Sequence, residues 1–288
     1  MLVAPATSLA LLVPCGLVDE GLPIERATVA RLFVAGADLR DLVGARPVGD
    51  VYSWFGSGDA AVRRNLLRLA RGVVRCPPFT PPHDHRGHVA RHFLSTAGVS
   101  ATVTLAQTRV PVSPADAAIA AEFWCARGLA GHCVLALHRG AGRAAKRWVD
   151  EGYRHVALWW RRRHGKILEI AGPADSYAAL EQADAVARDR PLSEVAALLA
   201  RADVVLGADS GVLHLAGAVG LRGVGLFGPT DPRRWRPLGG RIVCLTSRMP
   251  SVGQSRIPLE GISAERTVRA LRCVTPDLPA VDDGCGRE

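Results

Sequence analysis

Residues 204–214 read Val-Val-Leu-Gly-Ala-Asp-Ser-Gly-Val-Leu-His, and this stretch decides the fold class. Its apolar start predicts a buried β-strand over Val204–Gly207, and the polar pair that follows predicts a turn. Asp209 or Ser210 can cap a helix that continues to about Val219. A strand that leads at once into a helix is the repeating unit of a parallel α/β sheet, so the stretch favours that class.

The C-terminal half of the chain repeats this alternation. Further strands are expected at the short β-rich runs Cys133–His138, Lys166–Ala171, Gly223–Gly228 and Ile242–Leu245. One helix is expected to hold a set of residues at near-helical spacing, namely Trp148, Tyr153, Val156 and Trp160. A second helix is expected at Ser193–Ala200, with Ser193 as its N-cap. These elements predict an α/β domain over 113–276, and residues 277–288 are expected to form a tail.

The first half of the chain is less regular. Helices are expected near 27–33 and over 59–71, and strands near 50–55 and at 73–76. They predict a second α/β domain over 1–112. The stretch 109–114 carries two prolines, which favour extended chain, so it is expected to link the two domains.

Composition narrows the class of protein. With 48% hydrophobic and 22% charged residues, the chain is expected to be globular rather than disordered or fibrous. The net charge of +9 favours an anionic partner such as nucleic acid, a membrane surface or a phosphorylated substrate, although a biased genome could also produce it. Seven scattered cysteines without a C-x-x-C pair indicate neither a disulfide framework nor a zinc knuckle, and fit a reducing cytoplasm. The apolar N-terminus has no preceding Lys or Arg, so export is not favoured.

Three strand-to-helix turns are candidates for a ligand site, because ligands of open parallel sheets bind beyond the carboxyl ends of the strands. In the first turn, Gly140 and Gly142 let the backbone approach an anion, and Lys146 supplies a positive charge. An ordinary glycine turn with solvated basic residues is the alternative. The third turn, 227–232, offers the Thr230 hydroxyl, or serves only as a structural turn.

The second turn contains Asp209, Ser210 and Gly211, with His214 one helical turn later. The amides at the start of a helix are free to bind a diphosphate, and His214 would face the same side. Asp209 could instead serve only as a cap, and His214 as a structural residue. No G-x-x-x-x-G-K-S/T or G-x-G-x-x-G motif is present, so a P-loop or a dinucleotide fold is not expected.

Four ordered segments resemble glycosyltransferase family nine, the ADP-heptose:lipopolysaccharide heptosyltransferases. The segments are His138–Trp148, Gly172–Asp175, Asp209–Gly220 and Phe227–Pro237. The resemblance implies a GT-B fold, in which two Rossmann-like domains face each other across a cleft and the C-terminal one holds most of the nucleotide sugar. It also implies that a sugar, heptose, moves from an ADP-sugar to a lipopolysaccharide-type acceptor with inversion, without a metal or other cofactor.

The resemblance further implies roles for individual residues. Lys146 would neutralise the departing diphosphate, and the amides of Ser210–Val212 would hold its oxygens. Asp209 would hold sugar hydroxyls or the loop geometry, and His214 would stand near the phosphates. The expected partners are a nucleotide sugar and a glycan acceptor rather than nucleic acid, in the cytoplasm with peripheral contact to the inner face of the membrane.

The chain also departs from the pattern of this family. Arg139 stands where the family usually has Pro, and Arg143 and Ala144 replace other usual residues. The extra cations could tighten phosphate binding or disturb the loop.

A second departure concerns the catalytic base. The opening residues look like the second strand-helix unit of such a domain, so the first unit, with the G-x-x-G-D loop that carries the general base, is expected to be missing. An alternative function is therefore a catalytically impaired nucleotide-sugar-binding remnant. Nucleic-acid binding is a third hypothesis and rests on net charge alone.

A histidine-rich stretch precedes a predicted helix. It contains His83, Asp84, His85, His88 and His92. A metal site is not favoured, because catalytic metals need three well-placed ligands and no H-E-x-x-H motif is present.

Overall fold

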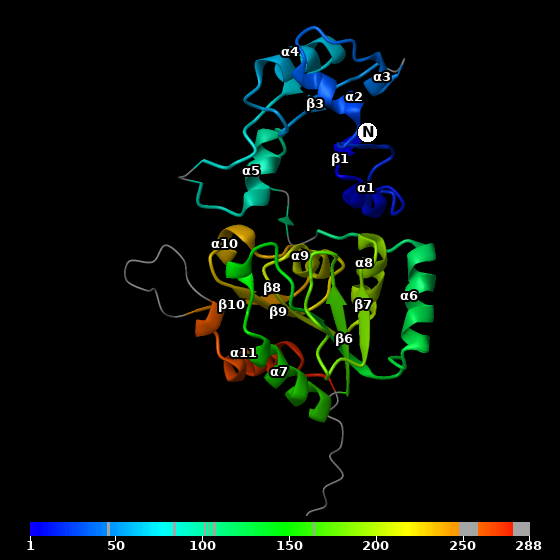
Figure 1. The fold of residues 1–288 in the computed structure, drawn as a ribbon. Helices are drawn as coiled ribbons and strands as arrows, with labels where there is room; N and C mark the ends of the chain where they lie inside the picture. The colour runs from blue at the N-terminus through cyan, green and yellow to red at the C-terminus, as the bar shows by residue number, and fades with distance from the viewer. Residues whose placement is uncertain are drawn as a thin grey trace, which may run out of the picture. The chain divides into compact units, whose positions relative to one another are not determined.

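The computed structural model describes residues 1–44, 47–82, 85–100, 102, 104–105, 108–163, 165–247 and 259–278. The chain divides into two compact units, Met1–Thr104 and Leu105–Glu288 (Figure 1). The boundary expected from the sequence, after residue 112, lies in the segment that leads into helix α6 (Pro114–Ala126).

The second unit is built around a six-stranded sheet with the order β10-β9-β8-β5-β6-β7. Its strands are β5 (Cys133–His138), β6 (Gly165–Ala171), β7 (Ala185–Arg188), β8 (Val204–Ala208), β9 (Gly223–Phe227) and β10 (Ile242–Thr246). All neighbouring strands are parallel. Strands β8 and β9 are buried along their whole length, because helices cover both faces of the sheet. The parallel α/β class that the sequence predicts is confirmed.

The helices form two layers around this sheet (Figure 1). Helices α7 (Asp150–Arg163) and α11 (Ala264–Val274) pack on one face, and α8 (Leu192–Arg201) and α9 (Gly211–Ala218) lie on the other. The core between the sheet and the first pair contains the fully buried Tyr153 and Trp160. Burial of such large side chains contributes roughly 1.5–3 kcal/mol each relative to exposure.

Two local expectations are corrected. The sequence prediction that Ser193 caps its helix is wrong, because α8 begins at Leu192 and its N-cap position is Pro191, without a side-chain cap. The aromatic helix begins at Asp150, so Trp148 precedes it; there its indole donates a hydrogen bond to the Ile262 carbonyl in the core.

The segment expected to be a linker is fastened to the second unit. The amide of Val110 donates to the Ala218 carbonyl, and Arg109 donates to the carbonyl of Val219. Gly220 faces the Arg109 guanidinium so closely that a Cβ there would overlap it. The extended segment at Arg109 and Val110 is therefore held against the C-terminal end of α9.

The first unit contains two short parallel ladders, one between β1 (Leu2–Ala4) and β2 (Gly21–Pro23) and the other between β3 (Val51–Tyr52) and β4 (Val74–Arg75). Its helices are α1 (Ala6–Leu12), α2 (Ala27–Ala30), α3 (Arg40–Val43), α4 (Ala60–Leu69) and α5 (Val89–Thr96), with a 3-10 turn at Arg31–Phe33. The start of α4 has a clear cause, since the Asp59 carboxylate accepts hydrogen bonds from two amides of the first turn. Among the helices described in either unit, none is long and apolar enough to cross a membrane.

Candidate functional site

The predicted site lies where the strand order of the sheet reverses. Along the chain, β5, β6 and β7 extend the sheet in one direction, and β8, β9 and β10 extend it in the other. Strands β5 and β8 are neighbours, and His138 at the end of β5 is in register with Gly207. The carboxyl ends of two such strands form the crevice in which open α/β sheets bind ligands. The loops after β5 and β8 therefore start from the place that this topology favours.

Four predicted residues come together around one carboxylate, and we call them the Asp209 cluster. Lys146 lies in the short 3-10 turn Ala144–Lys146, and its Nζ is 2.6 Å from Asp209 Oδ2. The Thr230 hydroxyl donates to the same oxygen at 2.6 Å. On the other side, His214 Nε2 is 3.5 Å from Asp209 Oδ1. Residues from two separate loops and helix α9 thus share the Asp209 carboxylate, which lies on a third loop.

The cluster keeps Asp209 ionised. Burial raises the pKa of its carboxyl, but hydrogen bonds from His214, Lys146 and Thr230, together with the charge of Lys146, outweigh burial and lower the pKa to about 2. A carboxylate with so low a pKa is a weak proton acceptor at neutral pH. Its geometry is that of a buried anchor that orients cationic and hydroxyl donors.

The donors around this anchor remain partly open to solvent. The side chain of Asp209 is 7% exposed, whereas those of Lys146 and His214 are 24% and 40% exposed. A lysine ammonium has three N–H donors, and its contact with Asp209 uses one of them. Among the contacts described for the cluster, Lys146 therefore keeps N–H donors without a protein acceptor, in the loop that follows the carboxyl end of β5.

Helix α9 begins beside the cluster. Ser210 is its N-cap, since its hydroxyl accepts a hydrogen bond from the Leu213 amide at 3.3 Å. This geometry decides between the two caps that the sequence allowed. The amides of Gly211 and Val212 have no helical partner one turn back, as at every helix N-terminus. A Cβ on Gly211 would meet nothing within 4 Å, so open space lies next to these amides.

The two glycines of the first loop differ. A Cβ on Gly140 would lie 2.4 Å from both carboxylate oxygens of Asp175, so this position requires glycine for packing. Gly142 is exposed, with nothing within 4 Å of a Cβ. Asp175 itself is buried and accepts a hydrogen bond from the Gly172 amide at 2.8 Å. The motif Gly172–Asp175 contains Asp175, but Asp175 was not among the predicted site residues. That motif is the sequence signal that could have indicated it.

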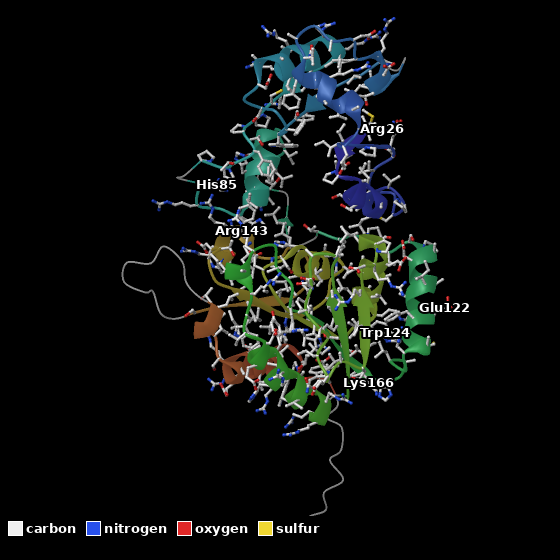
Figure 2. The ribbon with its side chains drawn as sticks, viewed as in Figure 1. Arg26, His85, Glu122, Trp124, Arg143 and Lys166 are labelled. Carbon is white, nitrogen blue, oxygen red and sulfur yellow. The ribbon has the colours of Figure 1, made fainter. Side chains whose placement is uncertain are left out.

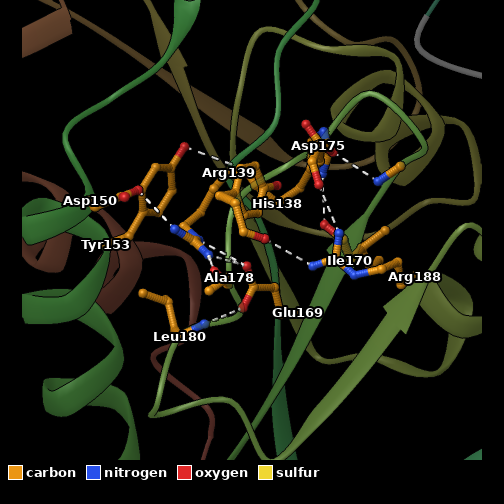
Figure 3. A network of polar contacts seen from close by, with 12 residues as sticks. His138, Arg139, Asp150, Tyr153, Glu169, Ile170, Asp175, Ala178, Leu180 and Arg188 are labelled. Carbon is orange, nitrogen blue, oxygen red and sulfur yellow. Dashed lines mark hydrogen bonds and ion pairs between the residues drawn. The ribbon is translucent and has the colours of Figure 1, made fainter.

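The two extra cations of the loop after β5, Arg139 and Arg143, differ in burial. Arg139 is 3% exposed and donates to Glu169 and Asp150 at 2.8 Å each, so its charge is directed away from the loop and into the protein (Figure 3). Neither outcome that the sequence left open, tighter phosphate binding or a clash, describes this arrangement. Arg143 is exposed at the loop surface (Figure 2).

His138 is a buried residue of the same strand end. One of its ring nitrogens, Nδ1, lies 2.9 Å from the carbonyl of Ile170. Burial lowers the pKa of its imidazole, against the opposing effects of the Ile170 carbonyl and the charges of Asp175 and Glu169. The neutral ring ties β5 to β6.

The histidine-rich stretch is engaged with the backbone. His83 and Asp84 lie outside the described residues. His85 Nε2 is 3.2 Å from the carbonyl of His88, and His88 caps α5 by accepting from the Ala90 amide. His92 is buried, with Nε2 2.8 Å from the Pro78 carbonyl. Within the described part of the chain, no group of three or more His, Cys, Asp or Glu residues could hold a metal ion.

A separate hollow of about 460 Å³ lies beside β10 and α11. Its polar lining includes Ser263, Arg266 and Arg269, and none of the predicted site residues lines it. Since its walls come from the edge strand β10, helix α11 and the turn that precedes this helix, it lies apart from the strand-order reversal at β5 and β8.

Comparison with known proteins agrees with this geometry. A sequence profile of glycosyltransferase family 9 (heptosyltransferase) matches residues 91–257. A search of curated proteins found no match. The glycosyl transferase family 9 structure from Veillonella parvula DSM 2008 is 19% identical with a TM-score of 0.75, and the alignment covers 94% of this chain and 86% of that one.

Two Escherichia coli structures have the same fold. The ADP-heptose lipopolysaccharide heptosyltransferase II is 17% identical with a TM-score of 0.68, over 94% of this chain and 88% of its own. The heptosyltransferase WaaC, solved with ADP, is 18% identical with a TM-score of 0.62, over 95% of this chain and 89% of its own. At these identities the structures show a shared fold, while the profile match spans more than half of the sequence. The chain therefore belongs to glycosyltransferase family 9, the heptosyltransferase family.

Proposed function

We propose that this glycosyltransferase moves heptose from an ADP-sugar to a lipopolysaccharide-type acceptor with inversion, and that the Asp209 cluster binds the donor diphosphate. The observation that carries the proposal is the set of partly exposed donors, Lys146 and His214, held over a buried carboxylate at the strand-order reversal. The open amides at the start of α9 lie next to them. The solved relative WaaC contains ADP, which supports a nucleoside diphosphate as the ligand.

The chemistry follows from where charge develops. An acceptor hydroxyl attacks the anomeric carbon, the bond from that carbon to the diphosphate oxygen breaks, and the electron pair leaves with ADP. Lys146 and the amides at Gly211 and Val212 would stabilise the new charge, since preorganised donors lower the barrier most where charge appears. In this proposal the ADP-sugar is a co-substrate and no further cofactor is needed, because protein groups supply the positive charge.

The proton of the acceptor hydroxyl needs an acceptor of its own. Asp209 is unsuited to that role, because hydrogen bonds hold its pKa near 2. None of the residues that match the family pattern supplies the base. Base catalysis contributes about 10²–10⁴-fold, so a chain without it would be the impaired, nucleotide-binding alternative.

The net charge of +9 suits an acceptor that carries phosphate or carboxylate groups. We propose that the protein works in the cytoplasm, in peripheral contact with the anionic inner face of the membrane. Sedimentation with anionic but not neutral vesicles at low salt would support this location, and equal sedimentation with both would contradict it.

Calorimetric titration with ADP tests the donor site. Lys146→Ala and Asp209→Ala should each weaken ADP binding by roughly 10–100-fold, since a hydrogen bond to a charged group is worth about 1.5–3 kcal/mol. Arg154→Ala is the control, because Arg154 is exposed on α7 and pairs only with Glu151 among the contacts described for it. Wild-type affinity in both site variants would show that the diphosphate binds elsewhere.

Turnover separates the two functional hypotheses. With ADP-heptose and a truncated lipopolysaccharide acceptor, an active enzyme releases ADP and extends the acceptor. Tight ADP binding without acceptor-dependent ADP release would favour the impaired remnant. Retention on DNA with a strong salt dependence, without ADP binding, would instead revive the nucleic-acid hypothesis.

A further inference from the structure

Arg139 has contacts that the proposed donor chemistry does not use. Its Nε donates to Glu169 Oε1 at 2.8 Å, one terminal nitrogen donates to Asp150 at 2.8 Å, and the other donates to the carbonyl of Ala178 at 2.5 Å. The guanidinium also stacks 4.1 Å from the centre of the Tyr177 ring. These partners come from β6, from the start of α7 and from the loop after β6, so one side chain joins three segments (Figure 3).

Glu169 extends this connection. Its side chain is fully buried, and its second oxygen accepts a hydrogen bond from the Leu180 amide at 2.8 Å. The ion pair therefore holds the loop after β6 at Ala178 through the arginine and at Leu180 through the glutamate. Burying two charges costs about as much as their attraction returns, so such a pair is better explained by the single conformation that it imposes.

At its N-terminal end, the loop after β6 also packs against the loop after β5, which is the first site loop and carries Lys146. Asp175 packs against Gly140, the neighbour of Arg139, and Arg188 donates to the carbonyls of Asp175 and Tyr177. The first site loop continues from Gly140 to Lys146 of the Asp209 cluster. Arg139 thus lies where the loop after β6 and the loop that carries Lys146 are fastened together.

We propose that Arg139 is a positioning residue that sets donor affinity without touching the donor, by holding residues 172–180 against the loop that carries Lys146. The proposal rests on the proposed donor site. With all the described contacts of its guanidinium made to protein groups and 3% of its side chain exposed, Arg139 has no surface to offer a ligand. Its effect on the donor passes through the loops.

The test compares Arg139→Met with the double variant Arg139→Met and Glu169→Met. The single variant leaves the Glu169 charge buried without its partner, so it also loses stability. The double variant removes both charges and should unfold at a higher temperature than the single variant, although the Leu180 amide loses its acceptor, and this difference separates stability from positioning. Arg154→Met is the matched control, because Arg154 is an exposed arginine with one acidic partner on the same helix.

Two measurements read the positioning. In the absence of nucleotide, the amides of Gly172 and Asp175, whose acceptors the double variant keeps, should exchange with solvent about tenfold faster, the equivalent of one net hydrogen bond. The KM for the ADP-sugar and the Kd for ADP should rise about tenfold as well, while kcat changes by less than about threefold. The control variant should match wild type in all of these.

Two outcomes would overturn the proposal. If the double variant binds ADP as wild type does, Arg139 serves stability alone. If ADP binding weakens while exchange of the Gly172 and Asp175 amides is unchanged, Arg139 contacts the donor directly. Since exchange is measured without nucleotide, it decides whether the loops are fastened even if wild-type protein fails to bind ADP, a failure that would refute the donor site instead.

Discussion

Two charged clusters each take their cation from the loop after β5, and they differ in how much of that cation solvent can reach. Each is centred on a buried carboxylate, Asp209 with a 7% exposed side chain and Glu169 with none exposed. The cation of the first, Lys146, is 24% exposed, whereas the cation of the second, Arg139, is 3% exposed. Only the first cluster therefore keeps donors for a ligand. A positive charge beside a strand end indicates an anion site only when its other partners leave it accessible.

The closed cluster, Arg139 with Glu169, should show the largest loss in the free energy of unfolding when it is mutated. Glu169→Met leaves the Arg139 guanidinium buried without its main partner, and breaking a buried pair in this way costs about 3–5 kcal/mol. Urea unfolding followed by circular dichroism measures the loss. Glu151→Gln is the control, because the side chain of Glu151 is 74% exposed. A loss as small as that of the control would mean that the two clusters do not differ in closure.

The open cluster, that of Asp209, should lose less free energy of unfolding when its carboxylate is removed. Asp209→Asn removes a charge that accepts from Lys146, His214 and Thr230, and the expected loss is about 1–3 kcal/mol because solvent can still reach the freed lysine. The same unfolding experiment applies, with Asp277→Asn as a control at a carboxylate that is 65% exposed. If Asp209→Asn were as damaging as Glu169→Met, Lys146 would be as enclosed as Arg139, and the comparison would fail.

The smallest effect should come from His138, which lies between the two clusters. Burial lowers the pKa of its imidazole below the ordinary 6.5, so the unfolded chain takes up a proton that the folded protein resists. This contribution is fully present above pH 6.5 and is lost as the pH falls below 6.5. His138→Asn keeps a donor for the Ile170 carbonyl but does not titrate.

Melting temperatures between pH 7.5 and 5 test this difference. The wild type should lose more stability than the His138→Asn variant over that range. Parallel curves for the two proteins would show that the imidazole of His138 is not buried in its neutral form. His138 would then have to be grouped with the solvent-accessible side chains around Asp209.

The strands of the second unit could be predicted because their local signal is strong. The runs at β5, β6, β8, β9 and β10 are apolar and short, and each ends at a glycine or polar turn. Helix α6 and strand β7 were not predicted. The alanine-rich α6 has no clear apolar stripe, and the four residues of β7 are too few for a pattern. The error at Ser193 arose because serine is a favourable N-cap residue, whereas the N-cap position of α8 lies two residues earlier, at Pro191.

The candidate site divides in the same way. Asp209, Lys146, His214 and Thr230 were predicted from loops that follow strands, and the structure brings them together. Their roles toward a donor stay a prediction. Asp175 was not included, because its approach to Gly140 depends on two loops that are far apart in sequence. The direction of Arg139 could not be inferred, because its partner Glu169 lies 30 residues away.

The sequence by itself determined that the chain alternates strand and helix, that three polar turns follow neighbouring strands, and that these turns resemble those of family 9. Hydrophobic periodicity and turn chemistry act over a few residues, so they can be read locally. Only the tertiary structure decided which charges remain available. Whether an arginine or a lysine faces solvent depends on carboxylates that lie on or directly after strands far away in the sequence. A buried carboxylate must be paired with a cation or hydrogen-bond donors, because a buried charge without a partner is costly. That is why Lys146 of the loop after β5 stays open to a ligand while Arg139 is closed.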